Sequence, residues 1–157
     1  MKNILILTGT SLLLFLLLLL VPACERENKE NSTDVCILSE KIMHKWIFLG
    51  FGNSGNAVTE RKPDNIKKMS IEFRSRNSFG AISACNGLGG YYCLYGTDSI
   101  RFDSILTTLR ACLNDTGNTW DNRYSSAIHR ASNYYIDADT LRLQAKDHTA
   151  LVFRIDK

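Results

Sequence analysis

Apolar and polar residues alternate at a period of two along much of the chain after residue 40. This is the pattern of strands with one face on a core and one in water. The predicted strands cover 45–51, 69–74, 78–85, 91–95, 99–102, 133–137, 140–144 and 150–155. Seven or eight strands with one helix predict a mainly β fold, built as a small antiparallel barrel or sandwich that closes its edges.

The period changes between the fifth and sixth of these strands. The spacing over 107–113 predicts a turn or two of helix. A second apolar set falls at helical spacing and predicts a helix whose stripe packs against the sheet: Trp120, Tyr124, Ala127, Ile128 and Ala131. Asn118 or Thr119 is the expected N-cap of that helix.

Two segments between predicted strands are rich in turn-forming residues. The segment 52–68 is expected to be a long loop. Residues 86–90 read Asn-Gly-Leu-Gly-Gly, with no helix after them and no lysine followed by serine or threonine. A phosphate-binding loop needs both features, so a sharp turn or bulge at a barrel corner is predicted instead.

The beginning of the chain has the order of a secretory signal, since Lys2 precedes an apolar run that continues to Val21. Val21-Pro22-Ala23-Cys24 follows, which is the pattern of a bacterial lipobox. Residues 1–23 are therefore predicted to be a lipoprotein signal peptide and Cys24 the lipidated residue. The alternative is an uncleaved transmembrane helix over 4–21, which Pro22 at the end of the run disfavours.

The lipid anchor predicts where the mature protein is held. Residues 25–34 carry no large apolar side chain, so 24–38 are expected to be the lipidated cysteine with a flexible tether, and 39–157 the folded domain. Glu25 is compatible with sorting to the outer membrane. The expected location is the cell envelope, on its periplasmic or surface face, with the membrane as a partner through the anchor.

Net charge and cysteine content limit the functions that this protein can have. Without Lys2 the chain keeps 18 basic and 16 acidic side chains, a net charge of +2 that does not favour nucleic acid. Cys36, Cys85, Cys93 and Cys112 are an even set in an exported chain, which predicts two disulfides. Three pairings are possible, and Cys85 with Cys112 and Cys36 with Cys93 are favoured. No two cysteines are close enough for a four-thiolate zinc site, so no metal is expected.

The chain resembles the META domain family, the group of HslJ-like, heat-inducible bacterial lipoproteins, over about residues 40–157. The residues that carry the resemblance most specifically are Trp46, Cys85, Asn86, Gly90, Tyr91, Thr108, Ala111 and Cys112. It implies a META-like β-barrel and an envelope or secreted protein linked to stress and drug tolerance, with no established catalytic activity. Ala84 in place of glycine, the long first loop, and the additional Cys36 and Cys93 depart from the family pattern.

Candidate chemistry is sparse. His44, His129 and His148 form no metal-ligand motif, and no Gly-x-Ser-x-Gly elbow is present. Five tyrosines could form an aromatic face for a ligand, but alternate packing in and out of the barrel is the favoured reading: Tyr91, Tyr92, Tyr95, Tyr134 and Tyr135. Asn86 is expected to hydrogen-bond backbone in its turn.

The sequence therefore predicts a non-enzymatic cell-envelope lipoprotein without a cofactor, which binds a partner or supports the envelope under stress. The partner would be an envelope or extracellular protein. One alternative is a partner-binding or inhibitor module that uses the 52–68 loop. Another is a small hydrolase whose site is assembled from residues distant in sequence, which would show clustered ionisable groups with shifted pKa values.

Overall fold

The computed structural model describes residues 35–53 and 57–157. The predicted signal peptide, the lipidated Cys24 and most of the tether lie outside the described residues. Residues 34–157 form one compact unit, close to the predicted domain 39–157. In the described part of the chain, the helix is too short and too polar to cross a bilayer.

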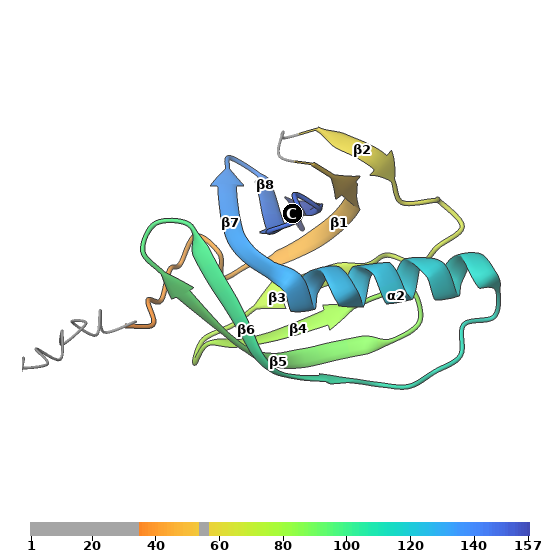
Figure 1. Cartoon of the computed structure of the whole chain (residues 1–157), viewed down its shortest axis with the longest axis horizontal. Helices are drawn as coiled ribbons and strands as arrows, with labels where there is room; N and C mark the ends of the chain where they lie inside the picture. Colours follow the sequence, from red (N-terminus) through yellow and green to blue (C-terminus); the bar gives the residue numbers. More distant parts are fainter. Residues whose placement is uncertain (1–34, 54–56) are drawn as a thin grey trace, which may run out of the picture. The chain divides into compact units, whose positions relative to one another are not determined.

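Nine strands and one helix build the domain (Figure 1). Their bounds are β1 Lys45–Gly52, β2 Val58–Arg61, β3 Ser70–Phe73, β4 Ser78–Ile82, β5 Gly87–Tyr95, β6 Ser99–Thr107, α2 Asp115–Arg130, β7 Ala131–Asp137, β8 Thr140–Ala145 and β9 Ala150–Ile155. Every neighbouring pair is antiparallel, in the order β1-β3-β4-β5-β6-β7-β8-β9, and β1 also pairs with β9. Eight strands thus close a barrel, as predicted, while β2 pairs only with β1.

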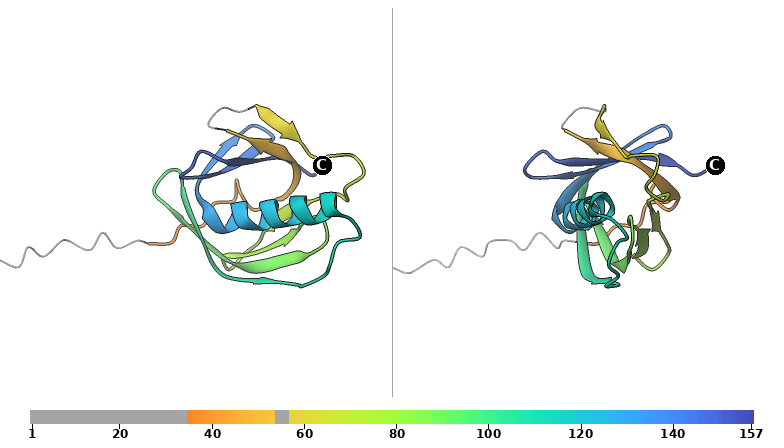
Figure 2. Two further views of the ribbon diagram at one scale, coloured as in Figure 1. Left: turned by 45° about the vertical axis from the view of Figure 1, so that its right-hand side comes forward. Right: turned by 90° about the vertical axis from the view of Figure 1, so that its right-hand side faces the viewer.

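The barrel has one weak seam, between β6 and β7. These two strands are paired at a single position, Ser99 with Asn133. Helix α2 connects them and contacts β6, β8 and β9, so it covers the place where they diverge (Figure 2). Where two strands of a barrel separate, another element must cover the exposed core, and the buried side chains of α2 do so here.

The core is aromatic where α2 meets the barrel. Phe48 on β1 has its ring centroid 5.1 Å from that of Tyr124 and 5.5 Å from that of Phe153. Trp120 lies 5.3 Å from Phe51. Such edge and tilted contacts add to the burial of large apolar area. The predicted stripe of the helix is confirmed, because Trp120, Tyr124, Ala127, Ile128 and Ala131 are all buried.

Tyr124 also carries the only hydroxyl among these core rings, which leads to a first prediction. The hydroxyl donates to the backbone oxygen of Ser70 at 2.9 Å, and burial raises the pKa of Tyr124 well above its ordinary value. Tyr124→Phe should lower the free energy of unfolding by about 1–2 kcal/mol, because a buried carbonyl loses its partner. Urea denaturation measures this, with Tyr135→Phe as the control, since Tyr135 is 38% exposed and should change little. Equal stability of the two variants would contradict the prediction.

Three predicted elements are wrong, two of them between β6 and the middle of α2. Residues 107–113 are not helical: Thr107 ends β6, and the backbone N–H of Thr108 donates to the oxygen of Gly87 at 3.0 Å. The helix begins at Asp115, and its cap is Asn114, whose side chain accepts from the N–H of Gly117. Asn118 and Thr119 lie inside the helix. Its first turn is polar, so hydrophobic spacing could not reveal the true start.

The third correction concerns loops. The 52–68 loop contains β2, a short exposed strand without the alternation that marks a buried face. Residues 87–90 are the first part of β5 rather than a turn, although the predicted bulge is present as a register shift between Gly89 and Tyr91. A Cβ on Gly90 would lie 2.8 Å from the backbone oxygen of Asp103. Close approach of β6 explains glycine at this position.

Candidate functional site

Four of the residues that carry the family resemblance meet at the turn between β4 and β5: Cys85, Asn86, Thr108 and Cys112. Asn86 stands at the centre of this turn, buried, and its side-chain amide makes four hydrogen bonds. Its Oδ1 accepts from the N–H of Arg110 at 2.7 Å and from Thr108 Oγ1 at 3.0 Å. Its Nδ2 donates to the oxygen of Arg110 at 3.2 Å and to Asp121 Oδ2 at 2.8 Å. The amide thus binds both backbone groups of Arg110, as a neighbouring strand would, and confirms that Asn86 bonds backbone.

Asp121 on α2 is the buried partner of the same turn. Its Oδ1 accepts from Ser83 Oγ, from the N–H of Cys85 at 2.9 Å and from the N–H of Asn86 at 3.1 Å. Burial by itself pushes the pKa of this carboxyl upward, but the hydrogen bonds from Ser83, Asn86 and Cys85 outweigh it. The pKa of Asp121 therefore lies below its ordinary value, and the carboxylate is charged at neutral pH.

The lowered pKa makes a second prediction, on acid stability. A carboxyl whose pKa is lower in the folded state contributes stability above its unfolded pKa of about 3.9, and this contribution is lost as the pH falls through the folded value. The wild type should therefore lose free energy of unfolding as the pH is lowered from 5 to 3. Urea denaturation of wild type and Asp121→Asn across that range tests it. The variant should lose less over the same interval, and parallel curves would contradict the assignment.

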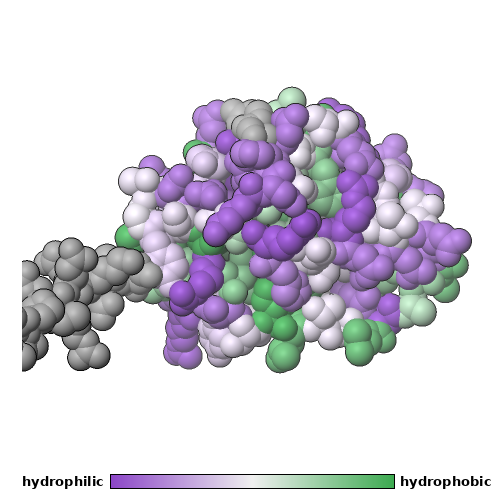
Figure 3. All heavy atoms as spheres, viewed as in Figure 1, coloured by the Kyte–Doolittle hydropathy of each residue, from purple (hydrophilic) through white to green (hydrophobic). Residues whose placement is uncertain are grey.

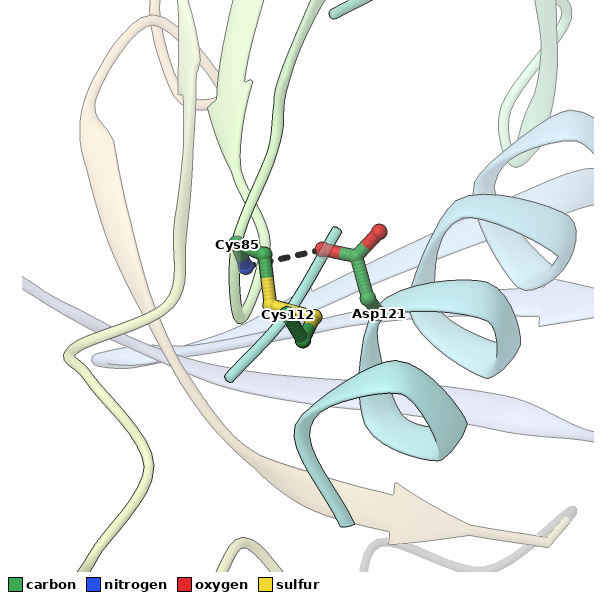
Figure 4. A group of neighbouring side chains, drawn as sticks. All are labelled: Cys85, Cys112 and Asp121. Carbon is green, nitrogen blue, oxygen red and sulfur yellow. Dashed lines mark hydrogen bonds between the residues drawn. A yellow bond between two sulfur atoms is a disulfide. The ribbon is translucent and has the colours of Figure 1, made fainter. Parts of the chain in front are cut away.

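A disulfide fixes the other end of the segment that Asn86 holds. Cys85 and Cys112 are joined, with their Cα atoms 5.5 Å apart, and Asp121 points from α2 toward them (Figure 4). Cys36 and Cys93 are joined as well, with a Cα separation of 5.2 Å. Both pairings are those favoured by the sequence, and both separations suit disulfide geometry.

Cys85, Cys112 and Asp121 also form a group with the residue types of a metal site. Their sulfur and oxygen atoms all lie within 4.8 Å of one another. The sulfur atoms are bonded to each other, however, and a metal binds thiolates. Asp121 Oδ1 already accepts three hydrogen bonds. In this oxidised state the group fits a structural cross-link between the turn, the following segment and α2.

The segment between β6 and α2 presents apolar side chains to solvent. Leu106 is 79% exposed, Leu109 97% and Leu113 fully exposed. We call residues 106–113 the leucine segment. Figure 3 shows hydrophobic side chains along the lower edge of the domain, where this segment runs in Figure 1. Exposed leucines are common singly, but three on one short segment held by Asn86 and a disulfide make this segment a candidate contact surface.

Grooves lie on both sides of the leucine segment. One, of about 470 Å³, separates residues 107–111 from Asn118, Asp121, Asn122 and Ser125 of α2. The other, of about 300 Å³, lies beside the disulfide and is lined by residues 65–67, 84–85 and 110–114 with Gly117. Both are open to solvent and within the size range of ligand pockets.

The other residues singled out in the sequence lie elsewhere. His44, His129 and His148 are all exposed, which confirms the interpretation that they are surface residues. Tyr92 is buried against Phe73 while Tyr91 is 59% exposed, so the tyrosines alternate as predicted. Trp46 is a core residue whose indole donates to the oxygen of Ile42.

Sequence reasoning missed Asp121, Ser83 and the exposed leucines. Asp121 lies between Trp120 and Tyr124, on the face of the helix that the apolar stripe predicts to be buried. This position was the feature of the sequence that could have identified it as a buried acid. The leucines at 106, 109 and 113 have helical spacing, which led to the wrong helix.

Comparison with known proteins places the fold. The META domain family model matches residues 44–157. An NMR structure of a protein from Burkholderia xenovorans is 17% identical, with a TM-score of 0.58, and the match covers 73% of this chain and 83% of that one. A crystal structure of a DUF4847 family protein from Bacteroides vulgatus is also 17% identical, with a TM-score of 0.59, over 75% of this chain and 96% of that one. No curated protein matches the sequence.

Proposed function

Because this chain belongs to the META domain family, we propose that it is a non-enzymatic binding protein of the cell envelope, lipid-anchored through Cys24, whose contact surface is the leucine segment. The observation that carries the proposal is the exposure of Leu106, Leu109 and Leu113 on a segment that the surrounding structure holds in place. A fixed apolar surface loses little conformational entropy on binding, which favours recognition of a partner.

The envelope location is supported by the cysteines. Both disulfides need an oxidising compartment, in which the predicted lipobox would place the domain. An envelope-stress role would follow if the partner is a component that stress exposes.

The non-enzymatic part of the proposal is supported by where the ionisable groups lie. Asp121 has a shifted pKa, but its hydrogen bonds are to Ser83, Cys85 and Asn86, which hold the turn together. The hydroxyl that donates to this carboxylate, Ser83 Oγ, belongs to a residue that is only 1% exposed, so a substrate could not reach it as a nucleophile. The three histidines are exposed, whereas Asp121 is buried.

Cross-linking in living cells tests the binding surface, as a third prediction. A tagged copy at native level should retain a specific envelope protein, and Leu109→Asp should lower its recovery at least tenfold, because a charge cannot enter an apolar interface without a cost of about 1.4 kcal/mol or more. Leu38→Asp is the matched control, since Leu38 is a 56% exposed leucine in the segment before β1. Undiminished recovery with Leu109→Asp would contradict the proposal.

The 52–68 region is the alternative contact surface. Its strand β2 is exposed, and Glu60 on it forms a two-point ion pair with Arg123 of α2 at 2.8 and 2.6 Å. Replacing the region in the same cross-linking experiment separates the two surfaces. Loss of the partner there, with Leu109→Asp unaffected, would favour the alternative.

A further inference from the structure

The backbone N–H and C=O groups of the leucine segment are hydrogen-bonded on one side of the chain only. The N–H of Thr108 donates to Gly87, and the N–H and oxygen of Arg110 both bond the side chain of Asn86. In an extended chain, successive residues direct these groups to opposite sides. The N–H and oxygen of Leu109 therefore point away from β5, and in the described structure neither has a protein partner.

The strand before this segment has an open edge as well. β6 pairs with β5 along its whole length but with β7 only at Ser99. The first half of β6 carries the charged residues Arg101 and Asp103. It ends at Ser104, where a φ of 53° bends the backbone out of the extended conformation. Such charges and kinks prevent pairing with another chain. Residues 105–111 carry a single charge, on Arg110, so this half is the part of the edge that can accept a strand.

Helix α2 forms the opposite wall of the groove along this edge. Asn118, Asn122 and Ser125 line it at positions i, i+4 and i+7, which lie on one face of a helix. Asp121 lies at its floor. The amide oxygen of Asn118 already accepts from the N–H of Cys112. Amide and hydroxyl side chains both donate and accept hydrogen bonds, so Asn122 and Ser125 are the residues of this wall that can bind the second edge of an extended chain.

We propose that the leucine segment binds an extended peptide of a partner protein, which adds as a β-strand to the edge at Leu109 and lies in the groove beside α2. This rests on the proposed function, because it names the kind of partner that the same surface takes. The free backbone groups of Leu109 supply the pairing, and the exposed side chain of Leu109 offers an apolar contact to a peptide side chain on the same face. A lipid surface could cover the leucines but would leave the amides of the groove unmatched. A second copy of this chain is disfavoured as the occupant, because the α2 helix that lines its own edge would meet the α2 helix of the first copy.

Selection from a phage-displayed library of random 12-residue peptides tests this, with the full-length chain in detergent micelles as target. A synthetic copy of an enriched peptide should slow amide hydrogen exchange at Leu109 at least tenfold. Exchange at Thr108 and Arg110, whose N–H groups are already bonded, should change by less than threefold. No enrichment, or protection elsewhere, would overturn the inference.

A pair of variants tests the helix wall. Asn122→Ala combined with Ser125→Ala should weaken the affinity for that peptide at least about fivefold, because two hydrogen bonds are lost. Ser126→Ala is the matched control, since Ser126 is an exposed serine of the same helix outside the groove. Equal affinity of both variants would overturn the placement of the peptide.

Further outcomes separate this inference from the proposed function. Loss of the cross-linked protein with Leu109→Asp, without any enriched peptide, would leave a binding protein and overturn strand addition. Protection of Leu109 by vesicles of phosphatidylethanolamine and phosphatidylglycerol, and not by peptide, would overturn it in favour of lipid. Protection that grows with protein concentration in the absence of peptide would overturn it in favour of a second copy.

Discussion

Asp121→Ala should lower the free energy of unfolding by about 3–4 kcal/mol, the largest effect we expect from a single polar substitution in this domain. The carboxylate is 6% exposed and receives hydrogen bonds from Ser83, the N–H groups of Cys85 and Asn86, and the Asn86 side chain. Removing it leaves the N–H of Cys85 without its acceptor and takes a charged acceptor from Ser83 and Asn86, which keep only hydrogen bonds to each other and to Arg110. Water entering the space would replace only part of what is lost. Urea denaturation at pH 7 measures the change.

The control for this variant is Asp64→Ala. Asp64 is an exposed acid in the segment between β2 and β3, so its removal should change stability by less than about 0.5 kcal/mol. The Asp121 variant should also expose the leucine segment to faster amide exchange at Arg110, since Asn86 loses the partner that orients it. A loss below 1 kcal/mol would show that the cluster does not hold the turn.

Replacing Cys85 and Cys112 together with alanine should lower the free energy of unfolding by about 3–4 kcal/mol. The disulfide closes a loop with a sequence separation of 27, and the cross-link restricts the unfolded chain over that length. It also anchors Cys112 beside the turn, so the variant should weaken capture of the partner as well as stability. Thermal and urea unfolding measure the first effect and cross-linking in cells the second.

The matched control is the pair Cys36→Ala with Cys93→Ala. Its loop is longer, with a separation of 57, so chain entropy predicts a loss of stability about 0.6 kcal/mol larger. That disulfide joins β5 at Cys93, whereas the leucine segment bonds the opposite end of β5 at Gly87, so capture of the partner should persist. The mass of the wild type should rise by four hydrogens on reduction. Free thiols in the untreated protein, or equal loss of capture in both variants, would contradict this assignment of roles.

Much of the fold could be predicted from local pattern. Six of the eight predicted strands begin and end within three residues of those in the structure, because alternation reports which side of a strand is buried. Strand β5 begins four residues before its predicted start at Tyr91. Strand β6 runs five residues beyond its predicted end at Phe102, since its second half is exposed and does not alternate. The same reasoning failed for β2, which has no buried residue and pairs only with β1.

Only part of the candidate site could be predicted from the sequence. Cys85, Asn86, Thr108 and Cys112 stood out as residues of the family pattern, and Asn86 was expected to bond backbone. Nothing in the sequence indicated that it would bond Arg110, which is 24 residues away. Asp121 was overlooked because an aspartate on a helix is normally solvated. The free energy of burying its charge is offset by hydrogen-bond donors of the turn at 83–86, which is distant in the sequence.

By itself, the sequence predicted a mainly β domain with one helix, a favoured pairing for four of the five cysteines, and a beginning that has the features of a lipoprotein signal. These follow from interactions between residues that are neighbours in the chain, from composition, or from a motif. Only the tertiary structure decided that residues 106–113 are extended and exposed instead of helical. Their helical spacing is a weak local preference, and Asn86, Gly87 and the Cys85–Cys112 disulfide overcome it with contacts that exist only once the barrel has formed.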